Sequence, residues 1–376
     1  MHGCPATAPS GTFRYVRVED PADIPPPDPY AIDVAVLDMN HGWPNLGHDS
    51  MVHAVREIGC DLVPILQGTG LYFRAISFEV RRRHLLPEPP GGRFVVYLGT
   101  GGPGHPDPYR NDGIAAGSQG IVEDPAWQTP CFQLLEAIRS DEDAVLLAVC
   151  HTFEVLCRWS GAAQPVMRGR VKGGKSSGVL ENILTPEALE HPWFSRFSAD
   201  LSGGRRLRVM DSRLYDMIPD RDRLPSGVIP ISYEAVSIGG PQGDALTMIE
   251  MARDRGGVMP RILAVNHHPE IVNRARERLI LEEKLARGDV TREWYEERAT
   301  ALTHRYPGED SERLLHLTSD YTLLAPMQFH LHRQLRLRAE KLGIEIGVHE
   351  DQVQERPSNA TEGPEGRLEG AGVLSH

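Results

Sequence analysis

Residues 146–154 read LLAVCHTFE, and this stretch decides the fold that the sequence predicts. The apolar run 144–149 is short and continuous, which is typical of a buried strand in a parallel sheet. It ends at Cys150, and the apolar spacing over 153–159 predicts a helix. A cysteine between a strand and a helix lies in a sharp turn above the helix N-terminus, where backbone N–H groups and the helix dipole favour the thiolate. The alternative is a buried structural cysteine, and two further stretches decide against it.

The first of these is a glycine-rich loop, 99–105 (GTGGPGH), that follows a predicted strand at 95–98. Glycines allow the backbone to approach a ligand closely and to direct N–H groups at an anion. No Gly-Lys-Ser/Thr follows the loop, and its spacing is not that of a dinucleotide-binding loop. The loop therefore predicts an anion-stabilising turn and not a nucleotide site.

The second is the end of a predicted strand at 262–265, which continues as NHHPE over 266–270. A two-residue offset near a strand end can place His268 and Glu270 on one face. The carboxylate can then fix the imidazole tautomer, and the imidazole can accept the proton of a thiol. The pattern thus predicts a nucleophile, a base and an orienting acid, each at the end of a strand.

Taken in this order, the three motifs resemble the class I glutamine amidotransferase family, whose pattern reads roughly Ser-Gly-Gly-Pro-Gly, Gly-x-Cys-x-Gly-x-Gln and Phe-His-Pro-Glu. The resemblance covers residues 31–275 and includes the segment 178–194 that follows the helix. It implies a glutaminase whose nucleophile, base and acid are Cys150, His268 and Glu270. It further implies an oxyanion hole formed by the backbone N–H groups of Gly102 and His151. The substrate-binding residues that it implies are Gly101, Thr152 and Glu154.

The sequence also departs from the family pattern close to Cys150. Ala148 and Thr152 replace the two flanking glycines, and Thr152 is expected to crowd the crossing of strand and helix. Glu154 replaces a glutamine that helps to hold the substrate, and its charge suits an ammonium better than a carboxylate. The segment 210–213 (MDSR) stands where the family often has a Trp-His or His-Gly-Asp sequence. His267 lies beside His268, and the Pro-Glu that follows favours His268 as the base.

Composition describes an acidic globular chain of 376 residues, 40% hydrophobic and 24% charged, with a formal net charge of −12. A general nucleic-acid binder would be basic, so this class is not expected. No signal-peptide pattern and no apolar run of about 20 residues are present, so no membrane association is predicted. The five cysteines are scattered without a Cys-x-x-Cys pair, which favours a reducing cytoplasm over a disulfide or zinc framework.

The predicted fold class is α/β, a mostly parallel doubly wound sheet with helices on both faces, plus a C-terminal helical extension. The predicted segments are a Pro-rich arm (1–30), the amidotransferase-like domain (31–275), the helical extension (276–349) and a disordered tail (350–376). Within the domain we expect strands at 32–37, 61–66, 206–210, 228–232, 236–238 and 246–251, and helices at 49–58, 70–83 and 130–138. The basic stretch 165–178 is expected to be a solvated turn.

Three functional interpretations remain open. The first is a glutaminase that releases ammonia for a separate synthetase chain. The second is a related hydrolase or acyltransferase with the same triad and another γ-glutamyl or acyl donor, which Thr152 and Glu154 favour. The third is a catalytically silent binding or regulatory protein. No cofactor and no metal are expected. His330 and His332 lie two residues apart on a predicted helix, so their side chains diverge and cannot share a metal ion. The charged extension makes a homodimer plausible.

Overall fold

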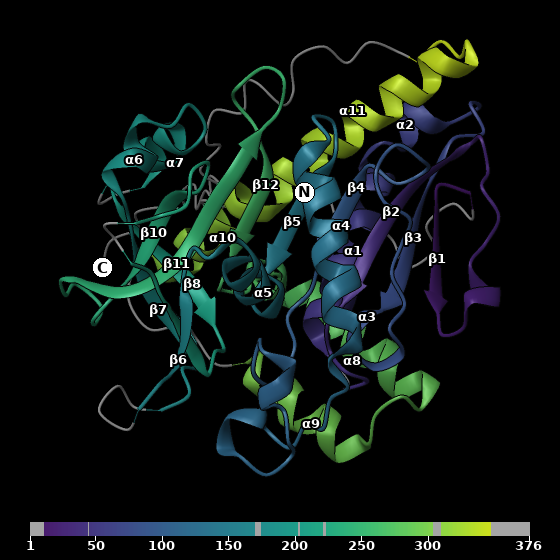
Figure 1. Cartoon of the computed structure of the whole chain (residues 1–376). Coiled ribbons are helices and arrows are strands. Elements are labelled where there is room, and N and C mark those ends of the chain that lie inside the picture. The colour runs from purple at the N-terminus through teal and green to yellow at the C-terminus, as the bar shows by residue number, and fades with distance from the viewer. Residues whose placement is uncertain are drawn as a thin grey trace, which may run out of the picture. The chain divides into compact units, whose positions relative to one another are not determined.

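The computed structural model describes residues 11–43, 45–169, 174–201, 204–220, 223–303 and 310–346, which belong to one compact unit (Figure 1). Predictions for residues 1–10, for 170–173 within the basic stretch and for the tail 350–376 lie outside these residues. The strands are β1 (Phe13–Val18), β2 (Ala31–Asp38), β3 (Tyr72–Glu79), β4 (Val96–Gly99), β5 (Val145–Val149), β6 (Gln164–Met167), β7 (Gly178–Leu184), β8 (Arg206–Asp211), β9 (Tyr215–Ile218), β10 (Ile229–Ala235), β11 (Gln242–Arg253) and β12 (Pro260–Val265). The α-helices are α1 (Leu46–Asp61), α2 (Val63–Leu66), α3 (Val80–Arg83), α4 (Gln128–Ser140), α5 (His151–Ser160), α6 (Pro186–Glu190), α7 (Phe194–Asp200), α8 (Arg274–Arg287), α9 (Arg292–Ala301), α10 (Ser311–Ser319) and α11 (Ala325–Leu342).

All these strands form one mixed sheet of 12 strands, which confirms the α/β class. Its main path runs β1-β3-β2-β4-β5-β12-β11-β10-β7-β8, and β9 joins β6 to β11. From β1 to β12 neighbouring strands are parallel, whereas β12 to β8 pair antiparallel. The parallel part therefore gathers the carboxyl ends of β2, β4, β5 and β12 at one edge of the sheet, where ligands of such sheets bind.

Two predicted elements that are neighbours in the chain are wrong. The predicted strand at 61–66 is the end of α1 and the short helix α2, and the predicted helix at 70–83 is the strand β3 followed by α3. Every residue of β3 is buried between β1 and β2. A strand enclosed in this way has no polar face, so its apolar spacing does not distinguish it from a buried helix. Arg74 fits inside because it donates to both carboxylate oxygens of Asp33 on β2, at 2.6 and 2.9 Å.

The region expected to be a Pro-rich arm contributes a strand to the sheet. Residues Phe13–Val18 form β1, which pairs with β3 in parallel over six residues and is an edge strand. The predicted strand at 236–238 is instead a turn after β10. Both differences arise because pairing with a strand remote in sequence, and not the local pattern, decides where an edge strand begins and ends.

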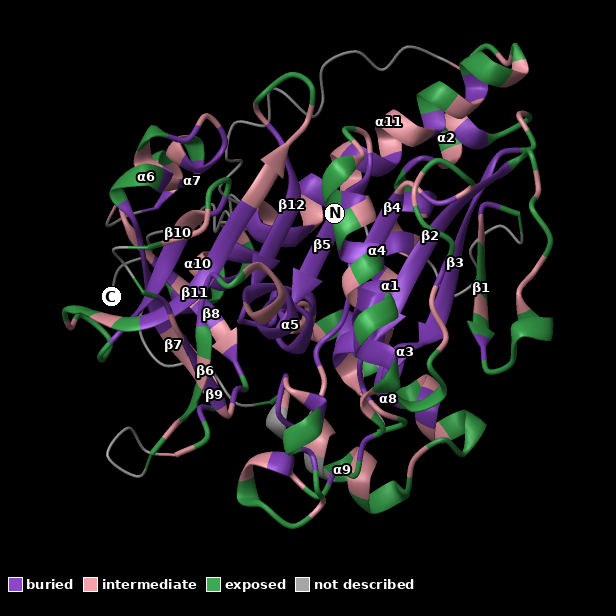
Figure 2. Cartoon of the chain, in the orientation of Figure 1, coloured by how far each residue is buried: buried purple, intermediate pink, exposed green. Residues whose placement is uncertain are grey.

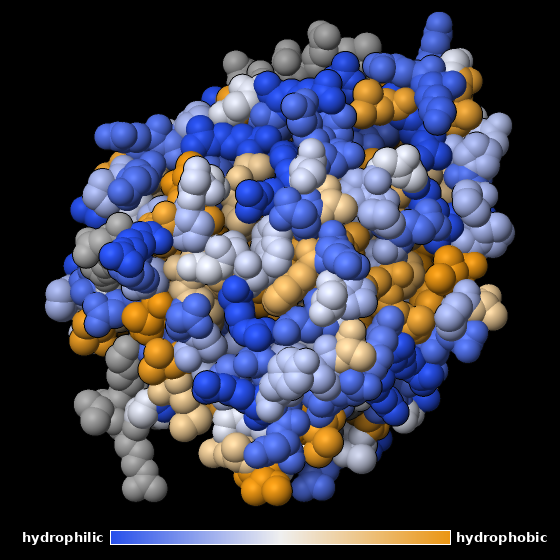
Figure 3. Space-filling model, in the orientation of Figure 1, coloured by the Kyte–Doolittle hydropathy of each residue, from blue (hydrophilic) through white to orange (hydrophobic). Residues whose placement is uncertain are grey.

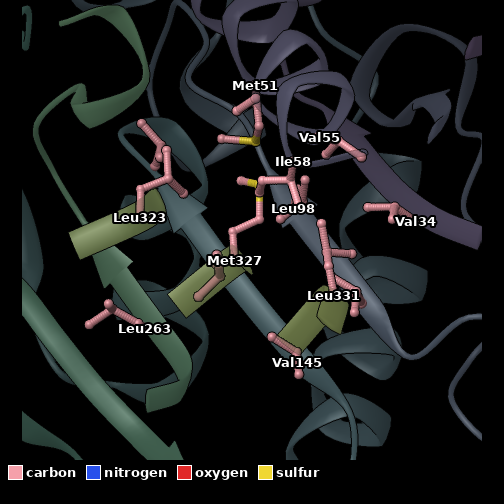
Figure 4. Packing of buried hydrophobic residues seen from close by; sticks show 14 of the residues in the cluster. Val34, Met51, Val55, Ile58, Leu98, Val145, Leu263, Leu323, Met327 and Leu331 are labelled. Atoms are coloured by element: carbon pink, nitrogen blue, oxygen red, sulfur yellow. The ribbon is translucent and has the colours of Figure 1, made fainter. Parts of the chain in front are cut away.

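Hydrophobic side chains on the two faces of the sheet form two separate cores, and burial is highest along its strands (Figure 2). The alternation is visible along β2, where Val34 lies in one core and Ala35 in the other. Helices α1 and α11 cover the first face, and α4 and α5 cover the second. Figure 4 shows Met327 and Leu331 of α11 beside Val145 of β5, so the C-terminal helix is part of this core.

The face of the molecule drawn in Figure 3 is mostly hydrophilic, with apolar areas between the hydrophilic side chains. Among the described helices, none combines the length and the apolar character that crossing a membrane requires. Cys131, Cys150 and Cys157 are free thiols.

Candidate active site

Cys150 lies at the turn between β5 and α5, as the sequence predicts, and its backbone is strained. Its φ of 49° and ψ of −108° fall in a region that side chains rarely adopt. The amide of Cys150 donates to the carbonyl of Val265 on β12 at 2.7 Å, which holds the turn against the neighbouring strand. The turn directs the side chain away from the sheet at the N-terminus of a ten-residue helix, where the helix dipole favours an anion.

The three predicted strand ends are adjacent because β5 pairs in parallel with β4 on one side and with β12 on the other. Gly99 is opposite Ala148, and Val265 is opposite Val149. A Cβ added to Gly101 would lie 3.3 Å from Cys150 Cβ, 3.7 Å from its Sγ and 3.0 Å from His268 Cε1. Gly101 therefore forms a wall shared by Cys150 and His268, and a side chain there would press against both residues.

His268 is held by Glu270 in the arrangement that a general base requires. Its Nδ1 lies 2.8 Å from Glu270 Oε1, and both residues are buried. Burial lowers the pKa of His268, but the Glu270 carboxylate and the Cys150 thiol together raise it well above its usual value. A protonated imidazole beside a thiol stabilises the thiolate. The geometry therefore suits proton transfer from Cys150 to His268.

Glu270 is positioned by elements that the local sequence does not reveal. A Cβ at Gly47, in the first turn of α1, would lie 2.6 Å from Glu270 Oε1, so a side chain there would require this carboxylate to move. The N-terminus of this 16-residue helix thus approaches the carboxylate of Glu270. Ser319 of α10 donates to the carbonyl of Pro269 at 2.6 Å and fixes the turn from behind.

The structure separates the two adjacent histidines. His267 is turned away from Glu270, and its Nε2 lies 3.4 Å from Thr322 Oγ1, in a π-helical turn between α10 and α11. Burial lowers the pKa of His267 to about 3, so its imidazole is neutral at pH 7. His267 thus joins the C-terminal helices to the sheet, and His268 faces Cys150.

The predicted oxyanion donors lie at the ends of β4 and β5. Within the described residues, the N–H groups of Gly102 and His151 donate no hydrogen bond, as a site for an oxyanion requires. A Cβ at Gly102 would overlap the carbonyl oxygen of Met39, so a side chain would displace this loop. The absence of a side chain at position 102 is therefore a condition for the loop conformation.

Arg81 holds this glycine-rich loop, a role that sequence reasoning missed. Its side chain is buried and donates to the carbonyl of Met39 at 2.9 Å and to that of Pro103 at 2.6 Å. Glu123 accepts from Nε and Nη2 of the same guanidinium at 2.5 and 2.9 Å, and both side chains are fully buried. The charge of Arg81 is thus compensated within the fold, and its remaining donors fix the loop that carries Gly102.

The hydroxyl of Thr152 is bonded to the backbone just after β4, and its role in substrate binding stays a prediction. Its Oγ1 donates to the carbonyl of Thr100 at 2.7 Å. A Cβ at Gly99 would overlap Thr152 Cγ2, so the threonine side chain occupies space that glycine leaves free on β4. The crowding expected where strand and helix cross is thus relieved by a glycine on the neighbouring strand.

Glu154 lies one turn after Cys150, and its amide donates to the carbonyl of Cys150 at 3.0 Å. The residue is only 4% exposed, and burial raises the pKa of its carboxyl to about 8. His151, fully buried, has its Nδ1 3.6 Å from Glu154 Oε2. Burial together with the charge of Arg81 lowers the pKa of His151 well below its usual value. A carboxyl and a neutral imidazole thus lie together beside the turn.

A buried network of charges at the ends of β8, β9 and β10 adjoins this site. Arg213 lies 3.3 Å from Asp211, 3.3 Å from Asp216 and 2.8 Å from Glu234. The side chain of Arg168 is only 7% exposed and pairs with Asp216 at 2.6 Å and with Glu234 at 3.0 Å, so the expected solvated turn is wrong for this residue. The amide of His268 donates to Met210 at 2.8 Å, which places the end of β8 next to the base. The MDSR segment was noted in the sequence, but nothing local indicated its partners on β9 and β10.

No family model matches the chain, and no curated protein matches it. Among solved structures, it is similar to a glutamine amido transferase from Methylobacillus flagellatus (12% identity, TM-score 0.40, 85% of this chain and 98% of that one). It is also similar to SMU.1228c, with 14% identity and a TM-score of 0.39 over 81% of this chain and 99% of that one. A third similar structure is a protein from Thermoplasma acidophilum described as a putative GMP synthase subunit, with 12% identity and a TM-score of 0.36 over 65% of this chain and 89% of that one. Because one fold can carry many activities, the chemistry has to be argued from the site itself.

Proposed function

We propose that the chain is a cysteine-dependent amide hydrolase of the glutaminase type, with Cys150 as the nucleophile, His268 as the base and Glu270 as the orienting acid. The observation that carries the proposal is the strained turn at Cys150 next to the His268–Glu270 pair, whose nitrogen and oxygen are 2.8 Å apart. Backbone strain of this kind costs on the order of 1–3 kcal/mol and persists where the surrounding structure enforces it. A structural cysteine needs neither the strain nor the imidazole.

The reaction follows from the positions of these groups. His268 accepts the thiol proton, and the sulfur of Cys150 attacks the carbonyl carbon of a carboxamide. The N–H groups of Gly102 and His151 stabilise the negative oxygen of the tetrahedral intermediate. The intermediate collapses as His268 returns the proton to the leaving nitrogen, which departs as ammonia and leaves a thioester on Cys150. Water, deprotonated by His268, then attacks the thioester and releases the carboxylic acid and the thiol.

Glutamine is the first candidate donor, and a separate synthetase chain is the proposed recipient of the ammonia. The described residues form one compact unit around a single sheet, so we place the ammonia-consuming reaction on another chain. A second candidate is a different γ-glutamyl or acyl donor with the same triad. The observation that favours it is Glu154, a buried carboxyl one helical turn from the nucleophile.

The experiment is ammonia release from glutamine by the purified chain, alongside Cys150→Ser. Cys131→Ser is a matched control because Cys131 is a buried free thiol on α4. Release that is lost in Cys150→Ser and kept in Cys131→Ser would support the glutaminase. Equal release from all three proteins would contradict it.

If no ammonia is released, a chloroketone analogue of glutamine distinguishes the remaining interpretations. Covalent labelling of Cys150 would indicate a competent glutamine site that requires a partner for turnover. No labelling of a folded protein would exclude glutamine and favour the second donor class. A thiol that also failed to react with iodoacetamide would favour a binding or regulatory role without catalysis.

A further inference from the structure

A small cavity lies at the amino-terminal edge of the parallel strands, opposite the edge that carries Cys150. It has a volume of about 50 Å³, and its polar lining consists of Asp33 near the start of β2, Arg93 before β4, and Gln334 and Arg338 on α11. A single water molecule needs about 10–15 Å³, so the cavity can hold a group of about four heavy atoms. The cavity is thus separate from the proposed active site and has no part in the reaction described above.

Arg93 is a buried guanidinium whose hydrogen-bond donors are mostly unused. Its side chain is 7% exposed, and its Nη1 donates to the carbonyl of Pro25 at 2.6 Å. Within the described residues, its Nε and Nη2 are shielded from solvent and donate no hydrogen bond. The guanidinium lies over the ring of Phe94, with Cζ 4.7 Å from the ring centroid. Because a buried donor without an acceptor costs stability, an acceptor is expected beside Arg93.

The carboxylate in the cavity wall does not supply this acceptor. Asp33 accepts from Nε and Nη2 of Arg74 at 2.6 and 2.9 Å, so a bidentate pair already holds it. Its Oδ2 lies 3.8 Å from Arg93 Nε, which is too long for a hydrogen bond. Glu88 lies 4.0 Å from the same nitrogen, and its side chain is 56% exposed, so water screens its charge. The charge of Arg93 is therefore compensated only in part.

Arg338 adds a second guanidinium to the same cavity. Its Nη1 donates to the carbonyl of Pro29 at 2.9 Å. In the part of the chain that the structure describes, no carboxylate lies within 4.0 Å of this guanidinium. Gln334 lies one helical turn before it and lines the cavity as well, with an amide that can donate. Two of the three charged residues in the lining are thus guanidiniums, and the third, Asp33, is already paired.

The alternative is that these arginines only hold the Pro-rich segment 25–29. Arg74, Arg93 and Arg338 each donate to one backbone carbonyl of this segment. Such a bond uses one of the five N–H donors of a guanidinium. For Arg93 it leaves two nitrogens buried without an acceptor among the described residues. Holding the segment therefore explains one contact of each arginine, whereas a ligand also explains the cavity and the unused donors.

We propose that this cavity binds a doubly charged oxyanion, such as a phosphate group, between Arg93 and Arg338. Two guanidiniums that lack full compensation match the charge of about −1.5 to −2 that a phosphate group carries at pH 7. A guanidinium binds phosphate through parallel N–H···O bonds, and Gln334 can add a neutral donor. The bound group would join α11 to the start of β2 and to the loop before β4. The site does not depend on the proposed function.

Isothermal titration calorimetry of inorganic phosphate into the complete chain, in a chloride buffer of constant ionic strength, tests the site. We expect saturable binding of one phosphate per chain, which acetate, with a single charge, does not reproduce. Glycerol 3-phosphate is titrated in parallel. If it binds at least as tightly as inorganic phosphate, the ligand is the phosphate group of a larger molecule; weaker binding would assign the site to free phosphate. Both results support the oxyanion site.

Two variants locate the bound phosphate, and a third is the control. Arg93→Gln and Arg338→Gln each remove one guanidinium and should each weaken binding roughly tenfold or more. Arg336→Gln removes an exposed arginine of the same helix and should leave the dissociation constant unchanged. Arg338 is half-buried at the end of its helix, so its variant decides the question if Arg93→Gln does not fold.

Three outcomes would overturn the inference. They are no saturable phosphate binding by the folded wild-type chain, acetate binding as tight as that of phosphate, and phosphate binding that Arg93→Gln and Arg338→Gln both retain. The titration measures binding and not turnover, so its result is independent of whether the chain hydrolyses an amide.

Discussion

Replacing Glu154 by Gln should change how the stability of the protein depends on pH. Burial raises the pKa of Glu154 from 4.5 to about 8 in the folded chain, whereas in the unfolded chain the carboxyl ionises near 4.5. Below pH 4.5 the carboxyl is neutral in both states and has no differential effect. Between pH 4.5 and 8 the unfolded chain loses its proton first, so the folded state loses stability as the pH rises. Above pH 8 both states are ionised, and the penalty stays constant.

The magnitude follows from the size of the shift. Each pKa unit corresponds to about 1.36 kcal/mol, so the complete shift would cost roughly 4–5 kcal/mol above pH 8. Glutamine has a similar shape and does not titrate. The free energy of unfolding of Glu154→Gln minus that of the wild type should therefore increase by about 1 kcal/mol per pH unit across this window. Other titrating groups cancel in the difference because both proteins contain them.

Urea unfolding of the two proteins at intervals of one pH unit, from pH 4.5 to 8.5, measures this difference. The control is Glu142→Gln, which removes an exposed carboxyl and should give a curve parallel to that of the wild type. Parallel curves for Glu154→Gln as well would mean that Glu154 is solvated or hydrogen-bonded in the folded protein.

Three further predictions concern the triad, the glycine-rich loop and the C-terminal helix. Glu270→Gln removes the carboxylate that stabilises the His268 imidazolium. It should slow alkylation of Cys150 by iodoacetamide at pH 7 and lower any turnover by roughly 10²–10⁴-fold. Unchanged rates would exclude this role of Glu270. Gly102→Ala places a Cβ against the Met39 carbonyl and should abolish turnover in a folded protein, whereas Gly169→Ala, with nothing within 4 Å, should not. Met327→Ala should lower the free energy of unfolding in urea by about 2–5 kcal/mol, because the Met327 side chain is fully buried in the core on one face of the sheet. A decrease well below this range would show that α11 is not required for this core.

The sequence was most informative where local chemistry is unusual. A buried strand that ends in cysteine, a Gly-Gly-Pro-Gly loop and a His-Pro-Glu turn each have few alternative explanations. The structure places all three at the ends of the parallel neighbours β4, β5 and β12. Their approach could be anticipated because parallel strands share one carboxyl edge. The choice of His268 over His267 also followed from local sequence, since only His268 is two residues from a carboxylate.

Sequence reasoning was least informative where the environment is supplied by remote residues. β3 was predicted as a helix because a strand buried on both faces shows no alternation. Arg168 was expected to be solvated, yet it pairs with carboxylates 48 and 66 residues away. Arg81 was not recognised at all, because its partner Glu123 is 42 residues away.

The sequence by itself determined the α/β class, the candidate nucleophile and the two residues that can activate it, because each depends on the order of a few neighbouring residues. Only the tertiary structure decided that Thr152 is directed at the carbonyl of Thr100, while Glu154 and Asp211 are buried beside His268. Burial and electrostatic compensation are properties of a three-dimensional neighbourhood. The electrostatic surroundings of Cys150 are therefore fixed in part by residues of the antiparallel strands, far from Cys150 in the chain.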